Sequence, residues 1–345
     1  MDILAKPSSP SNKEEAMVTS QHLDPVTVEV ISKALSSIAD ENRASLIKSS
    51  YSTNIKERQD CSSAVMDAKG QVICIGDESV HVHMSSFMFT GPEILRRFPE
   101  EALHEGDMFM VNDVYSGGPS HMADITFVSP VFVEGELMAF VGNTGHWPDM
   151  GGKAPGQCAL GDATEIYQEG IRIPPVRLYR AGELQKELLE MLLLNVRDSE
   201  DRAGDIRAHV GAVKLAERRM KELAARYEKG MIPACMEELI RLTELKTRHA
   251  IAQLPEGEYE ASDFMDDDMD SDEPIPIKVK IPISHQPQPS ITLDWTGTGK
   301  AAKWGINNPY QGTASAVYWV MRSVLDPDIP ALAGFQKCFD IIIPK

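Results

Sequence analysis

The sequence predicts an α+β fold, in which mixed strands and loops come first, a helical segment follows, and a smaller α/β part closes the chain. Apolar residues recur at helical spacing after residue 24 and again over residues 183–254. Between residues 60 and 145 they instead alternate with a period of two, as strands require. A third stretch of strict alternation starts at Ile275 and is followed by a helical pattern, which gives the C-terminal α/β part.

The first helix is predicted to begin at Asp24 and Pro25. Aspartate is a favoured N-cap and proline is favoured in the first helical turn. Two hairpins should follow, because turn residues Lys69-Gly70 and Glu134-Gly135 each separate two apolar runs. Residues 112–124, between the hairpins, are rich in Gly, Ser and Pro and are predicted to form a loop.

Three regions are expected along the chain. Residues 1–22 are polar and rich in Ser and Pro, which is typical of a disordered leader. Residues 23–254 should form one domain that ends in the helical segment 183–254. Residues 255–345 should form a second, smaller strand–helix domain, in which the prolines of strand 275–283 indicate a sheet edge.

Composition excludes several classes of protein. The 345 residues carry a formal net charge of −18, which disfavours binding to nucleic acid or to anionic membranes. The five cysteines include no CxxC pair, so a disulfide framework or a thiolate zinc site is not expected. With no apolar run near the length of a membrane span, we expect a soluble, cytoplasmic protein.

Two histidines and one aspartate near glycine-rich loops are candidate metal ligands. His121 and Asp124 are three residues apart, and His146 follows directly after an expected strand. Two imidazoles and a carboxylate suit zinc, manganese or iron and leave positions open for water or substrate. On residue types alone, ordinary polar loop residues and the site of an iron oxygenase stay open as alternatives.

Other polar residues have competing interpretations. His81 and His83 alternate with valines, which predicts one face of a strand and a structural role, with substrate contact as the second choice. Asp60 ends a charged run and is, by itself, a surface carboxylate. Asp149 either orients a ligand or shapes a turn.

Several ordered motifs together resemble the hydantoinase B/5-oxoprolinase family, which includes the metal-site subunits of acetone and acetophenone carboxylases. The resemblance covers residues 24–345. It rests on the segments KERQDCS (56–62), NDVYSGGPSHMAD (112–124), GHWPDMGG (145–152), TEIYQEGIRIPP (164–175), NVRD (195–198) and LDPDIP (325–330).

The resemblance implies a function in an ATP-dependent complex. A hydantoinase A-type partner would bind ATP and phosphorylate the substrate, and this chain would direct water or carbon dioxide at the activated substrate. No GxxxxGK[ST] or GxGxxG motif occurs in this chain, in keeping with ATP use by the partner. A small cyclic amide is the expected substrate and a ketone the alternative, in a hetero-oligomer with the partner.

The resemblance also assigns residues. It places metal ligands at Asp60, His121, Asp124 and His146. We further assign substrate contacts to His83, Asn112 and Tyr115, and a catalytic role to Asp149.

Some positions depart from the family pattern. Val114 replaces a usual proline, and Pro119-Ser120 lengthens the loop before His121. Family members are also longer, so the chain is expected to be truncated and the C-terminal domain incomplete. The leading hypothesis is a subunit of a cyclic amide hydrolase of the hydantoinase/oxoprolinase type. The alternatives are a ketone carboxylase subunit and a catalytically incomplete scaffold.

Overall fold

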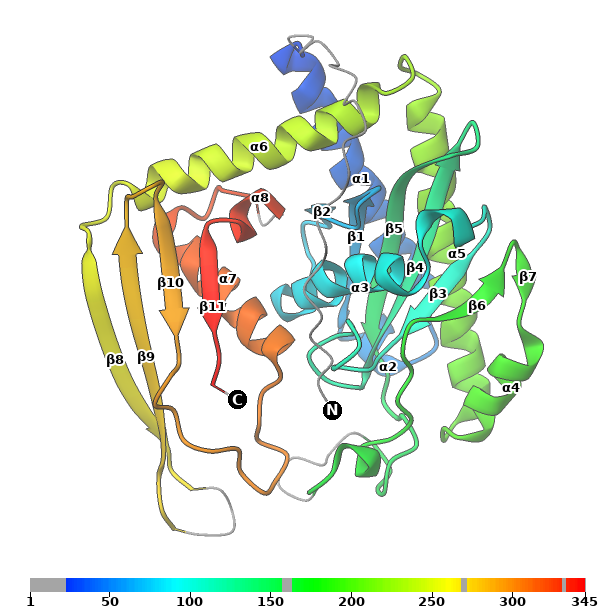
Figure 1. The fold of residues 1–345 in the computed structure, drawn as a ribbon. Helices are drawn as coiled ribbons and strands as arrows, with labels where there is room; N and C mark the ends of the chain where they lie inside the picture. Colours follow the sequence, from blue (N-terminus) through cyan, green and yellow to red (C-terminus); the bar gives the residue numbers. More distant parts are fainter. Residues whose placement is uncertain (1–22, 157–162, 268–271, 331–332, 345) are drawn as a thin grey trace.

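A computed structural model of the chain describes residues 23–156, 163–267, 272–330 and 333–344. Helices combine with a seven-stranded and a four-stranded sheet, which confirms the predicted α+β class (Figure 1). The predicted leader, residues 1–22, lies outside the described residues.

The larger sheet is antiparallel throughout and contains both predicted hairpins. Its strand order is β2-β1-β5-β4-β3-β6-β7. Strands β1 and β2 form the first hairpin, and β4 and β5 form the second. The strands are β1 (Cys61–Asp67), β2 (Val72–Ile75), β3 (Met108–Val111), β4 (Asp124–Val133), β5 (Glu136–His146), β6 (Val176–Arg180) and β7 (Glu183–Leu184).

Helices cover both faces of this sheet. Helices α1 (Pro25–Ser49) and α5 (Ser199–Ala224) contact one face, and α3 (Met84–Arg97) contacts the other. Successive strand residues point to opposite faces. Val65 and Phe127 accordingly belong to the core beside α1 and α5, and Ala64 and Val128 to the core beside α3.

The predicted helical segment contains α4 (Lys186–Leu194), α5 and α6 (Met231–Ile251), after the short strand β7. Helix α5 stops at Ala224, and Gly230, whose backbone is left-handed (φ +84°), directly precedes α6. Helix α6 crosses the molecule and contacts both α1 and α8 (Ala333–Gln336) (Figure 1). Within the described residues, none of the helices is both long and apolar enough to cross a bilayer.

The C-terminal sheet has the order β11-β10-β9-β8. Its strands are β8 (Gly257–Met265), β9 (Ile275–Ser284), β10 (Ser290–Asp294) and β11 (Phe339–Ile342), and α7 (Tyr310–Leu325) packs near them. The predicted edge position of 275–283 is wrong, because β8 lies outside β9. Pro276 is tolerated because β9 pairs with β10 only between Lys280 and Ser284. Phe109 and Leu293 share one apolar cluster, so a domain boundary near residue 255 stays a prediction.

Four short helical elements complete the fold: α2 (Thr53–Lys56), η1 (His81–His83), η2 (Glu100–Ala102) and η3 (Ile166–Gln168). The predicted strand at residues 80–83 is wrong, since η1 is a 3₁₀ turn that leads into α3. The amide of His83 donates to the Val80 carbonyl over 3.0 Å, which closes the turn. A four-residue alternation is too short to separate a strand from such a turn.

Candidate functional site

Three strand ends bring the candidate ligands together. Asp124 starts β4 and His146 ends β5, and the two residues are direct partners in the antiparallel register. Asp60 precedes β1, and its carbonyl accepts the amide hydrogen of His146 at 3.0 Å. Because directly opposed residues of antiparallel strands place their side chains on the same face, the hairpin register itself sets Asp124 beside His146.

His121 completes a cluster of three potential ligands. His121 Nε2 lies 3.1 Å from one carboxylate oxygen of Asp124, and His146 Nδ1 lies 3.3 Å from the other. One ligand atom from each of the three residues lies within 4.8 Å of the others. The two imidazole rings are 5.1 Å apart between centroids. Such a convergence of two nitrogens and a carboxylate has the donor set of a catalytic zinc, manganese or iron site.

The carboxylate of Asp124 is the strongest structural indication of a missing partner. Its side chain is fully buried, yet neither oxygen has a hydrogen-bond partner of good geometry in the described part of the chain. Burial alone would raise its pKa, but the charges of His83 and His121 hold the pKa well below its usual range. A buried, ionised and unbonded carboxylate is costly, and a cation held between the imidazoles would satisfy it.

His83 and Asp60 extend the cluster. His83 Nε2 lies 3.4 Å from a carboxylate oxygen of Asp60 and 3.3 Å from a carboxylate oxygen of Asp124. The other ring nitrogen lies 3.0 Å from Ser62 Oγ, which fixes the orientation of the ring. Asp60 also lies 3.7 Å from His146 Nδ1. The structure therefore brings His83, expected to contact substrate, into direct contact with two predicted metal ligands.

His121 faces an open pocket. Its side chain is 41% exposed. Partial burial lowers its pKa, but the nearby carboxylates of Asp124 and Asp60 dominate and raise the pKa above the usual value. A cavity of about 590 Å³ lies over the cluster. It is lined by His121, His146, Tyr115, Glu169, residues 302–305, Asn307 and Pro309, among others.

Sequence reasoning missed Glu169, although the motif TEIYQEGIRIPP contains it. The side chain lines the same pocket as His121 and His146. Burial raises the pKa of its carboxyl group, and the charge of His121 partly opposes this change. The signal was present in the sequence, as an acidic residue inside a motif of the resemblance.

Asn112 and Tyr115 have different surroundings. The buried Asn112 side chain accepts from Ile173 N at 2.7 Å and donates to the Met122 and Ile171 carbonyls, so backbone groups occupy it. Tyr115 is 69% exposed at the pocket, beneath the guanidinium of Arg172. Of the two, Tyr115 is the one with a free side-chain surface in the pocket.

Asp149 organises the second glycine-rich loop. Its carboxylate accepts from Arg197 Nη1 at 2.9 Å and from the amides of Gly151 and Gly156. These partners are the reason that its pKa is lowered, although burial acts in the opposite direction. Gly151 has φ +86°, and a Cβ there would meet the Asn195 carbonyl at 1.9 Å. The contacts are those of a residue that holds a loop, and its predicted catalytic role stays a prediction.

A second polar network contacts β5 on the face opposite to His146. Trp147 follows His146 and points to the opposite face, where its indole N–H donates to His209 Nε2 at 3.3 Å. His209 Nδ1 donates to Asn143 Oδ1 at 2.7 Å, and Asn143 donates to Asn42 at 2.8 Å. The network ties β5 to α5 and α1, and thereby fixes the strand end that carries His146.

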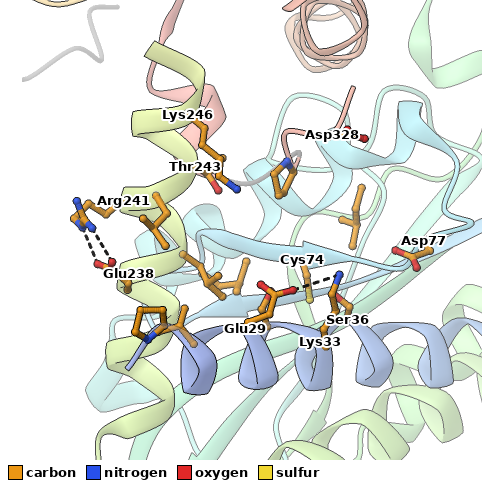
Figure 2. Close-up of a pocket in the computed structure, with 18 of the residues that line it drawn as sticks. Glu29, Lys33, Ser36, Cys74, Asp77, Glu238, Arg241, Thr243, Lys246 and Asp328 are labelled. Atoms are coloured by element: carbon orange, nitrogen blue, oxygen red, sulfur yellow. Dashed lines mark hydrogen bonds and ion pairs between the residues drawn. The ribbon is translucent and has the colours of Figure 1, made fainter. Parts of the chain in front are cut away.

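A larger cavity of about 1030 Å³ lies between α1, β2, α6 and residues 327–330 (Figure 2). Its wall carries ion pairs within single helices, such as Lys33 with Glu29 and Arg241 with Glu238. None of the predicted site residues lines it. The smaller cavity is therefore the candidate active site.

Comparison with known proteins agrees with this site. Residues 24–345 match the Hydantoinase B/oxoprolinase family. A protein described as a putative D-/L-hydantoinase subunit, from Pseudomonas sp. (strain NS671), is 32% identical over 333 residues. That match covers 94% of this chain and 56% of the relative. The chain belongs to the Hydantoinase B/oxoprolinase family, as the motifs predicted, and spans about half the length of this relative.

Solved structures share the fold. The ATP-dependent caprolactamase from Pseudomonas jessenii superimposes with a TM-score of 0.84 at 27% identity, covering 94% of this chain and 55% of that chain. Acetone carboxylase in its nucleotide-free state gives the same TM-score at 18% identity, covering 93% and 44%. The second likeness shows a common fold alone.

Proposed function

We propose that the chain is the metal-binding subunit of an ATP-dependent hydrolase of cyclic amides, of the hydantoinase/oxoprolinase type. The observation that carries the proposal is the buried Asp124 carboxylate between His121 and His146, at the base of a ligand-sized pocket. The hydantoinase and caprolactamase names of its relatives favour ring-opening hydrolysis as the reaction.

The residues fit a divalent transition metal. His121, Asp124 and His146 would hold the ion, with Asp60 and His83 as close neighbours. Zinc, manganese and iron all accept this donor set. When bound, the ion would polarise a carbonyl group or make water a better nucleophile near neutral pH.

The chain's own side chains would prepare the substrate for attack. Tyr115 and Glu169 flank the pocket beside His121 and offer a hydroxyl and a carboxyl group to a polar ligand. Burial raises the pKa of the Glu169 carboxyl, which favours a role in proton transfer. The buried network behind His146 would keep the ligand set fixed while a substrate enters.

A hydantoinase A-type partner would use ATP. It would transfer the γ-phosphoryl group to the amide oxygen of the substrate and release ADP. Water would then add to the activated carbon at the present site, and the carbon–nitrogen bond would break as the ring nitrogen takes up a proton, which leaves an acyl phosphate. A second water would hydrolyse the acyl phosphate to the open-chain carboxylate and free phosphate. The active assembly is accordingly a hetero-oligomer.

The proposal is tested by supplying the chain with hydantoinase A-type subunits and measuring ADP release with hydantoin or 5-oxoproline. We expect release that depends on the cyclic amide and is lost in His121→Ala, and no ATP hydrolysis by this chain alone. Substrate-dependent ATP hydrolysis by the single chain would overturn the division of roles.

The alternative activities give different results in the same assay. A ketone carboxylase would require acetone or acetophenone with bicarbonate and would ignore cyclic amides. A catalytically incomplete scaffold would retain metal and show no turnover with any partner.

A further inference from the structure

The pocket over the metal centre has a wall from a distant part of the chain. Residues 302–309 belong to the connection between β10 and α7, more than 150 positions after His146, and most of them line the same cavity as His121 and His146. In Figure 1 this orange segment runs along the bottom of the molecule, beside the green segment that contains η3. This wall therefore lies across the cavity from the candidate metal ligands and supplies none of them.

The segment keeps its shape through bonds of its own. The Asn307 side chain accepts from Ala302 N at 2.7 Å and donates to the carbonyls of Ala302 and Trp304 at 2.8 and 3.1 Å. The amide of Ile306 also donates to the Trp304 carbonyl at 2.8 Å. Asn307 thus closes a compact turn that presents residues 303–305 to the pocket.

Trp304 gives this wall a flat aromatic surface with an unused donor. Its indole N–H is shielded from solvent and has no hydrogen-bond acceptor in the described part of the chain. The ammonium group of Lys303 lies 5.2 Å from the centre of its ring. Since a buried donor without an acceptor is unfavourable, a small rotation of the indole that turns this N–H to the pocket would let the carbonyl oxygen of a ligand satisfy it.

We propose that Trp304 determines the specificity of this pocket for flat cyclic amides. The ring face would pack against the ring of the ligand, and the indole N–H would bind a carbonyl oxygen. A cavity of about 590 Å³ has the size of sites for ring-containing ligands, and a flat cyclic amide combines an apolar ring with the acceptor that the wall lacks. This inference rests on the proposed function, because it takes the pocket over the metal centre as the substrate site.

The test is a ligand-observed NMR titration of the zinc-loaded full chain with hydantoin and 5-oxoproline, whose five-membered rings are close to flat. Trp304→Ala is expected to weaken binding by about threefold to tenfold, because aromatic packing contributes on that scale. Trp304→Phe keeps a flat ring without the donor, and its affinity should lie between those of the wild type and Trp304→Ala. The exposed Trp319→Ala is the matched control and should bind like the wild type.

Two further variants separate the possible failures. Asn307→Ala should weaken binding while the zinc content stays unchanged, since it loosens only the turn. Equal affinities in wild type and Trp304→Ala, or no binding of any probe by the zinc-loaded wild type, would overturn the specificity role. Whatever the result for Trp304, loss of zinc in His121→Ala would still support the proposed function. Zinc retention in His121→Ala would count against the proposed function and against the specificity role of Trp304.

Discussion

Two polar clusters lie on opposite faces of the same strand end, and they differ in how well their polar atoms are satisfied. On the α5 face, His209, Asn143, Asn42 and Trp147 satisfy one another in a closed hydrogen-bond network. On the α3 face, Asp124 is equally buried and has imidazole nitrogens 3.1–3.3 Å away, but no hydrogen bond of good geometry in the described part of the chain. His146 and Trp147 are neighbours in sequence and belong to different clusters.

The difference separates a structural histidine, His209, from the histidines of the candidate site. Burial lowers the pKa of His209 to about 3, with the charge of Arg202 acting in the same direction, so the ring is neutral and serves packing. His121 has a raised pKa because carboxylates surround it. A saturated cluster needs nothing more, whereas a buried carboxylate that has only imidazoles around it and no well-formed hydrogen bond supports the proposed cation site.

The largest effect is expected from Asp124→Asn, which removes the charge while keeping the shape. We predict loss of bound metal, measured by elemental analysis after dialysis. In the metal-free protein at alkaline pH, the free energy of unfolding should change by no more than about 1 kcal/mol, because the lost carboxylate had no hydrogen bond.

Asp107→Asn is the matched control for that prediction. Asp107 is as buried as Asp124, but it is bound by Arg177 at 3.0 Å and by the Ala181 amide at 2.8 Å. This variant should keep its metal and lose on the order of 3 kcal/mol of stability, because a buried ion pair is broken. If Asp107→Asn lost its metal while Asp124→Asn kept it, and if Asp124→Asn were the less stable of the two, the comparison of the two carboxylates would be invalid.

His209→Ala tests the closed network. It leaves the Trp147 indole N–H and the Asn143 carbonyl without partners, so the free energy of unfolding should fall by roughly 2–4 kcal/mol. Chemical denaturation of the metal-free protein measures this change. A loss below about 0.5 kcal/mol, the range of surface substitutions, would mean that the network is not a structural support.

Ser62→Ala tests whether His83 supports the metal cluster. Ser62 Oγ lies 3.0 Å from His83 Nδ1, and removing a group that orients a residue beside a metal typically costs about 10–100-fold in metal affinity. Competition with a chelator measures the change. The neighbouring Ser63→Ala is the control, because Ser63 bonds to Ala39 on the opposite face, and an equal loss of affinity in both would remove His83 from the site.

The smallest predicted effect, over the single pH unit that is measured, is a dependence on acid pH. The pKa of His209 is about 3 in the folded protein against an ordinary value near 6.5, because burial disfavours the charged ring. The unfolded chain therefore binds the proton first, and stability present above pH 6.5 is lost as pH falls toward 3, by about 1.4 kcal/mol per pH unit. His209→Gln should lose less stability than the wild type between pH 6.5 and 5.5, and parallel curves would contradict the assignment.

Local patterns predicted most of the fold. The hairpins followed from Lys69-Gly70 and Glu134-Gly135, and the helices from apolar spacing, since both signals act over a few residues. The strand assigned to residues 80–83 and the edge assigned to β9 were wrong. Both depend on contacts with distant segments, Ser62 for η1 and β8 for β9.

The site was predictable to a similar degree. The motifs pointed to His121, Asp124 and His146, which the structure brings together. The wall formed by residues 302–309 could not be predicted, because no local pattern shows that a connection before α7 lies over the end of β5. Likewise, the contacts of Asn112 and Asp149 with backbone groups depend on how two glycine-rich loops fold.

The most direct test of the central claim is the metal content of the purified full chain, prepared with metal supplied, next to His121→Ala and the exposed His104→Ala. We expect about one transition-metal ion per chain in the wild type and in His104→Ala, and none in a folded His121→Ala protein. A wild type without metal, or full metal content in His121→Ala, would contradict it.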